Sequence, residues 1–229
     1  MEQYQLNTSS DKPEMTFERF MDRLFEIYND CNQEVYYSEI FIPFFRMCAP
    51  PKTKIVPIYN ERNFGPHTDN ATKNFQRMKV ISAPKENDKY VVPDFIYVPS
   101  EYSFDNPCKP YLMIETKAPV LHQGGHYYRN LRDYIDANYS ELKAEIEACN
   151  HVIFTDGITW MFLEQNEQGH IVESEKYPTI KLVDEHKKYY KTDLITIKHN
   201  NNTVPFEWNN LKKQITALVL DKLSENTSH

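Results

Sequence analysis

The amino-acid sequence predicts one α/β domain of the mixed-sheet (α+β) type, with a central β-sheet flanked by helices and extra helices near both ends of the chain. Apolar residues recur at helical spacing near both ends, in residues 16–32, 33–48 and 208–223. Short apolar runs bounded by proline and turn residues lie between them, as strands do. With 229 residues and 40% hydrophobic content, the chain is large enough for one sizeable core.

The first half begins with a polar arm, residues 1–15, that we expect to be loose. Thr16 suits the N-cap of a first helix, and a second helix with a broad apolar face follows from about Glu34 to Cys48, with Pro43 as an expected kink. The β-branched run 54–59 and the segments 75–83, 94–98 and 111–117 are predicted strands. The predicted core of the domain is residues 34–165.

The second half continues with a helix over 140–149 and a strand over 151–155. Asp156-Gly157 is a tight-turn signal before a returning strand over 158–163. Further strands are expected near 171–172 and 192–198, and an amphipathic helix over 208–223. Residues 166–229 are therefore predicted to be an extension packed on the core.

Composition narrows the possible classes of protein. A net charge of −7 weighs against a general nucleic-acid binder, although a local positive surface and metal ions could still support a nuclease. No apolar run approaches the ~18 residues of a membrane helix, and no secretory signal is visible at the start. The four scattered cysteines are typical of reduced thiols. We therefore expect a cytoplasmic protein that does not contact a membrane.

Charged residues concentrate on two neighbouring predicted strands. Asp94 opens the first strand, and Glu115 and Lys117 lie two residues apart on the second, so both project from the same face. An acid and a lysine on an otherwise apolar strand are costly to bury without partners or a metal. A polar turn joins the strands into an antiparallel pair, which would place Asp94 beside Glu115 and Lys117. The alternative is a purely structural role, in which Glu115 and Lys117 form an exposed ion pair and Asp94 is simply the first residue of its strand.

The order of these motifs resembles the PD-(D/E)XK nuclease superfamily, which has the restriction-endonuclease-like fold. Pro93-Asp94 is followed by Glu115-Thr116-Lys117 on the next strand, then by a helix and by Thr155-Asp156-Gly157 before an aromatic strand. The same order is found in the N-terminal nuclease domain of type I restriction enzyme motor subunits. The likeness covers about residues 39–163. The glutamine that this relative often carries in the helix is not matched, because Glu141-Leu142-Lys143 occupies the expected place.

The resemblance implies a metal-dependent phosphodiesterase. Mg²⁺ or Mn²⁺ would be bound by Asp94, Glu115 and the backbone carbonyl of Thr116, because these ions prefer oxygen ligands. Lys117 would position or deprotonate the attacking water, or stabilise charge at phosphorus. Glu39, on an N-terminal helix, would be an additional catalytic carboxylate; its alternative is a partly exposed helix glutamate.

The expected partner is nucleic acid, most simply DNA in prokaryotic or phage defence or DNA processing. Contacts to it are expected from His122 and Gln123, in a glycine-containing segment, and from Lys143, although surface histidines are the simpler interpretation. A homodimer is predicted, since cutting both strands usually needs two sites. A separate motor or recognition subunit is a further expected partner, because the sequence has no Gly-Lys-Ser/Thr phosphate loop. The alternatives are an inactive nuclease-fold module that binds nucleic acid or protein, and a structural role without nucleic acid.

Overall fold

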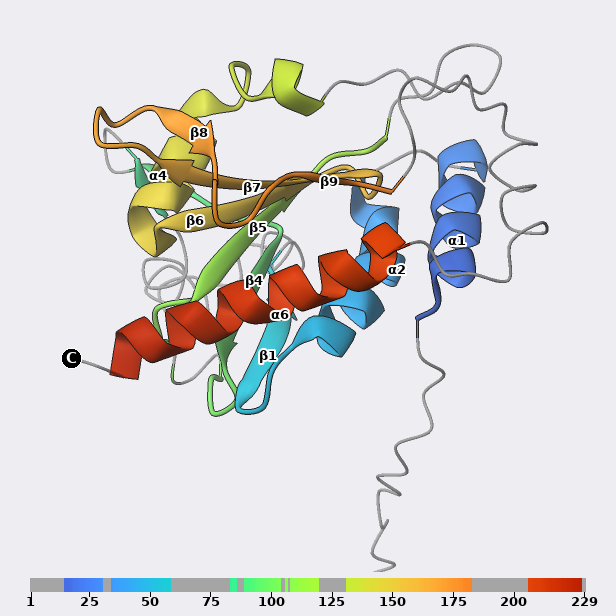
Figure 1. The fold of residues 1–229 in the computed structure, drawn as a ribbon, viewed down its shortest axis with the longest axis horizontal. Helices are drawn as coiled ribbons and strands as arrows, with labels where there is room; N and C mark the ends of the chain where they lie inside the picture. Colours follow the sequence, from blue (N-terminus) through green and yellow to red (C-terminus); the bar gives the residue numbers. More distant parts are fainter. Residues whose placement is uncertain are drawn as a thin grey trace, which may run out of the picture.

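The protein is seen in a computed structural model, which describes residues 15–30, 34–58, 83–85, 89–103, 106, 108–119, 131–182 and 206–227 (Figure 1). These residues form a seven-stranded sheet, both parallel and antiparallel, that is flanked by four helices. The predicted α/β class with a mixed sheet is therefore confirmed.

The sheet places the two motif strands side by side near its centre. Its order is β1-β4-β5-β6-β7-β8, with β9 also paired to β7, and every pair is antiparallel except β5 with β6. The strands are β1 (Thr53–Pro57), β4 (Phe95–Pro99), β5 (Leu112–Thr116), β6 (His151–Thr155), β7 (Thr159–Gln165), β8 (Ile171–Glu173) and β9 (Ile180–Lys181). A separate two-stranded sheet contains β2 (Ala83–Lys85) and β3 (Lys89–Val91).

Helices cover both faces of the large sheet. They are α1 (Phe17–Asp30), α2 (Glu34–Cys48), α4 (Tyr139–Cys149) and α6 (Phe206–Thr227), with a short 3-10 helix η2 (Leu131–Tyr134) before α4. Thr16 caps α1, because its Oγ1 accepts a 3.2 Å hydrogen bond from the N–H of Arg19. Helix α4 lies in the connection between the parallel strands β5 and β6, as such a crossover requires.

The alternation of side chains along β5 divides the core into two clusters. Leu112 and Ile114 join α1, α2 and α6 in one cluster, which is rich in aromatic rings. Trp160 and Trp208 are both fully buried there, among the rings of Phe20 and other phenylalanines. On the opposite face, Met113 packs in a second cluster with residues of α4, β6 and β7. Helix α4 is thus held against the face of β5 from which Glu115 also projects.

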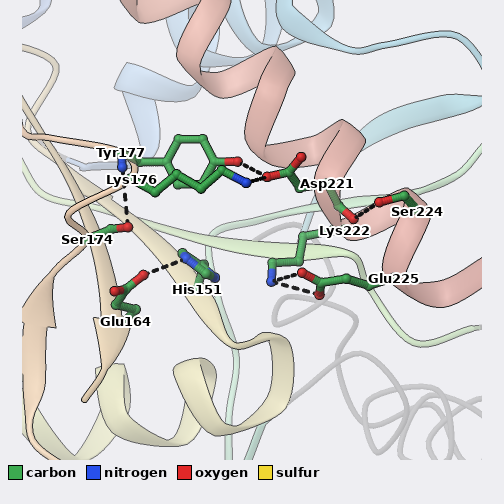
Figure 2. A network of polar contacts seen from close by, with 9 residues as sticks. All are labelled: His151, Glu164, Ser174, Lys176, Tyr177, Asp221, Lys222, Ser224 and Glu225. Carbon is green, nitrogen blue, oxygen red and sulfur yellow. Dashed lines mark hydrogen bonds and ion pairs between the residues drawn. The ribbon is translucent and has the colours of Figure 1, made fainter. Parts of the chain in front are cut away.

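Polar contacts fasten the C-terminal half of α6 to the segments around β8 and β9 (Figure 2). Asp221 accepts hydrogen bonds from Tyr177 and Lys176, and the nearly buried Lys222 pairs with Glu225 at 2.9 Å. Nearby, His151 pairs with Glu164 at 2.8 Å. Burial, and then the charge of Lys222, lower the pKa of His151. His151 begins β6 whereas Thr155 ends it, so this network lies at the opposite end of the strand from Thr155.

Several predicted elements differ from the structure. The strands expected at 75–83 and 192–198 lie largely or wholly outside the described residues. The pair Ile180–Lys181 forms a short strand, β9, within a segment that its mixed, charged sequence did not identify as a strand. Helix α2, by contrast, runs through Pro43 to Cys48, as predicted. None of the described helices is long and apolar enough to cross a membrane.

Candidate active site

Asp94 lies immediately before β4, where its carboxylate is held by the neighbouring strand. The register pairs Phe95 with Ile114, so one step further along the two strands Asp94 stands opposite Glu115. Asp94 Oδ2 accepts a 2.8 Å bond from the N–H of Thr116 and a 2.7 Å bond from its hydroxyl. Two donors on one oxygen fix the orientation of the carboxylate. Thr116 thus orients Asp94 through its N–H and its hydroxyl. The metal contact predicted for the Thr116 carbonyl would be a separate role of the same residue.

Glu115 and Lys117 form a short ion pair in a nearly buried position. Lys117 Nζ lies 2.7 Å from Glu115 Oε1, and the two side chains are only 15% and 10% exposed. Burial raises the pKa of Glu115 to about 8, the charge of Asp94 adds to this rise, and Lys117 offsets part of it. A carboxylate that is hard to ionise beside a second carboxylate is the environment in which a divalent cation has most effect.

Glu145, on α4, is a further acidic residue that the sequence analysis did not identify. Its side chain is fully buried, and neither carboxylate oxygen has a hydrogen-bond partner among the described residues. Burial raises the pKa of Glu145, followed by the charges of Glu115 and Asp94. The sequence could have predicted that Glu145 is buried, because it shares the i, i+3, i+4, i+7 spacing of one helix face with Leu142, Ile146 and Cys149.

The Thr155-Asp156-Gly157 turn supports the end of β5 structurally. Asp156 is fully buried, and its Oδ1 accepts hydrogen bonds from the N–H groups of Ile158 and Thr159 at 3.0 and 2.8 Å. The carbonyl of Thr155 accepts a 2.8 Å bond from the N–H of Lys117. The turn therefore fixes the backbone at Lys117.

The other predicted residues lie apart from this group or outside the described structure. Glu39 pairs with Arg23 at 2.7 Å, with both side chains about half exposed, and both line a cleft of about 750 Å³ between α1 and α2. The structure does not bring Glu39 to Asp94 and Glu115. Lys143 lies on α4 with its ammonium 3.7 Å from Glu147, and both side chains are well exposed. His122 and Gln123 fall outside the described residues.

The donors at Asp94 and Glu115 suit a hydrated divalent cation. Among the described residues, no three His, Cys, Asp or Glu side chains converge closely enough to enclose an ion by themselves. Even so, hard oxygen ligands are present in Asp94 and Glu115, and Glu145 adds a buried carboxyl group with no described hydrogen-bond partner. Mg²⁺ usually keeps several waters and takes only one or two protein carboxylates, so the residues fit such an ion.

Comparisons of the chain with protein-family models, with curated proteins and with solved structures found no match.

Proposed function

We propose that the protein is a metal-dependent nuclease that hydrolyses phosphodiester bonds in nucleic acid, with Asp94, Glu115 and Lys117 as its centre. The observation that carries the proposal is the grouping of two carboxylates and one ammonium on adjacent strands. The raised pKa of Glu115 supports it, because burial and the charge of Asp94 disfavour the ionised form unless a cation is present. Perturbed acids of this kind cluster at functional sites.

The residues divide the chemistry between them. Asp94, oriented by Thr116, and Glu115 would hold Mg²⁺ or Mn²⁺, with the carbonyl of Thr116 as a further ligand. The ion would supply a water of lowered pKa and offset charge on the phosphate. Lys117 pairs with Glu115 at 2.7 Å, and a cation held by Glu115 would weaken that pair; the Lys117 ammonium could then orient the attacking water or contact the phosphate.

The substrate proposed is DNA, cut internally in prokaryotic or phage defence or in DNA processing, in the cytoplasm. The overall charge of −7 requires that binding depend on a local surface and on the cation rather than on a general positive field. A homodimer and a separate motor or recognition subunit are the proposed protein partners.

Incubation of the purified protein with nucleic acids tests the proposal. The substrates are supercoiled plasmid, linear duplex, single-stranded DNA and RNA, each with Mg²⁺, Mn²⁺ or EDTA, beside Lys117→Ala. We expect cleavage of at least one substrate that requires the metal and is lost in Lys117→Ala. If no substrate is cut but one is bound, the inactive binding module is the better description.

A further inference from the structure

Glu145 is the one described acidic side chain that is fully buried with both carboxylate oxygens unpartnered. Leaving a carboxylate in that state costs several kcal/mol if it is charged, so a residue of this type needs a compensating group or a reason to be retained. Its neighbours on the same helix face are the apolar Leu142 and Ile146, where a leucine or methionine would pack without such a cost.

The position of Glu145 relates it to the candidate active site. Helix α4 packs against β5 on the face that carries Met113, and Glu115 follows Met113 on that face. The charges of Glu115, Asp94 and Glu141 add to the rise in the pKa of Glu145, in keeping with the packing of α4 against β5. Lys117 also acts on Glu145, but it already pairs with Glu115 at 2.7 Å. Beside this one described ammonium, four acids therefore act on one another: Asp94, Glu115, Glu145 and, on the same helix, Glu141.

We propose that Glu145 is the third carboxylate of a divalent-cation site at Asp94 and Glu115, and that it reaches the cation through a coordinated water. A water-mediated contact agrees with the finding that no three described acidic side chains enclose an ion directly. It also explains the absence of described hydrogen-bond partners, because both oxygens are left to accept from the waters of a hydrated ion. This inference rests on the proposed function for the existence of the cation, and adds a residue to its site.

The test is Mn²⁺ binding, measured by titration calorimetry and by the Mn²⁺-induced rise in the unfolding temperature, in the wild type, Glu145→Gln and Glu147→Gln. Glu147 lies on the same helix but is half exposed and faces Lys143, so it is a matched control. We expect Glu145→Gln to weaken Mn²⁺ binding about 10- to 100-fold, as loss of an outer-shell partner does, and Glu147→Gln to leave it unchanged. In EDTA, Glu145→Gln should unfold at the same temperature as the wild type or higher.

Several outcomes would overturn the inference. Unchanged Mn²⁺ affinity in Glu145→Gln, beside a wild type that binds Mn²⁺ and cuts nucleic acid, would remove Glu145 from the site and leave the proposed function intact. A wild type that binds no Mn²⁺ would contradict both the role of Glu145 and the proposed metal-dependent function. Glu145→Met provides a second variant with no hydrogen-bonding group. If neither variant folds in EDTA, the carboxylate serves folding rather than a cation, which also contradicts the inference.

Discussion

Replacing Lys117 with methionine should separate the stability of the site from its chemistry. Methionine keeps most of the aliphatic length of lysine and removes the ammonium that lies 2.7 Å from Glu115. Breaking a buried pair of fixed charges typically costs about 3–5 kcal/mol, because one charge is left without compensation. Here the cost should be smaller, because the remaining carboxyl group can take up a proton.

The pKa of Glu115 determines how much stability Lys117→Met should lose. At about 8, it leaves the group only half ionised at pH 8, so losing the charge attraction of Lys117 costs the folded, metal-free protein less than about 1 kcal/mol there. Losing that contribution and one hydrogen bond of about 1 kcal/mol predicts a total cost of about 1–2 kcal/mol for Lys117→Met in EDTA. Cleavage in Mg²⁺ should nevertheless fall at least about 100-fold, because a group that contacts the reacting phosphate or water is gone.

Urea unfolding followed by tryptophan fluorescence measures the loss of unfolding free energy, since Trp160 and Trp208 are both fully buried. Initial rates of cleavage in Mg²⁺ measure the loss of activity. A loss of more than about 3 kcal/mol in EDTA at pH 8 would show that Glu115 is a fixed charge in the resting protein, and would refute the reasoning from its pKa.

Three further predictions concern the metal-free fold and the surrounding residues. In EDTA the free energy of unfolding should fall as the pH rises toward about 8, because folded Glu115 and Glu145 keep protons that the unfolded chain releases near pH 4.5. The fall, measured by urea unfolding, should be clearest above pH 6.5, because below it the lowered pKa of His151 offsets part of the fall. Gly157→Ala should cost about 2–4 kcal/mol in the same assay, because φ is +85° and the new Cβ would lie 2.7 Å from a leucine of α1; a change below about 1 kcal/mol would contradict that packing. Glu39→Gln should change stability by less than about 0.5 kcal/mol and leave cleavage unaltered, since its ion pair is exposed; lost cleavage would return Glu39 to the catalytic group.

The motif strands were predictable because their signals are local. Prolines bound each strand, and the period of two places Glu115 and Lys117 on one face, where the structure pairs them. The short polar turn between the strands predicted their antiparallel pairing, which sets Asp94 opposite Glu115. The contacts of Thr116 with Asp94 were not predictable, because they depend on the rotamers and spacing of two strands.

Residues outside the strand pair were harder to place. Glu145 was missed because its helix was interpreted from its apolar residues alone, although it shares their spacing. Glu39 was expected to reach the site from α2, but the direction of a helix side chain depends on how the helices pack. In the structure Glu39 faces Arg23 of α1. Strand β9 is only two residues long and owes its place to pairing with β7, which no local pattern encodes.

The most direct test of the central claim compares wild type and Asp94→Asn, purified in parallel, on supercoiled plasmid. The wild type should cut in Mg²⁺, stop when EDTA is added and resume when Mg²⁺ is restored in excess. Asp94→Asn should unfold at a similar temperature, because an amide oxygen can still accept from Thr116, and should not cut under any of these conditions. Cleavage that persists in EDTA, or equal cleavage by Asp94→Asn, would contradict a metal-dependent centre at Asp94, Glu115 and Lys117.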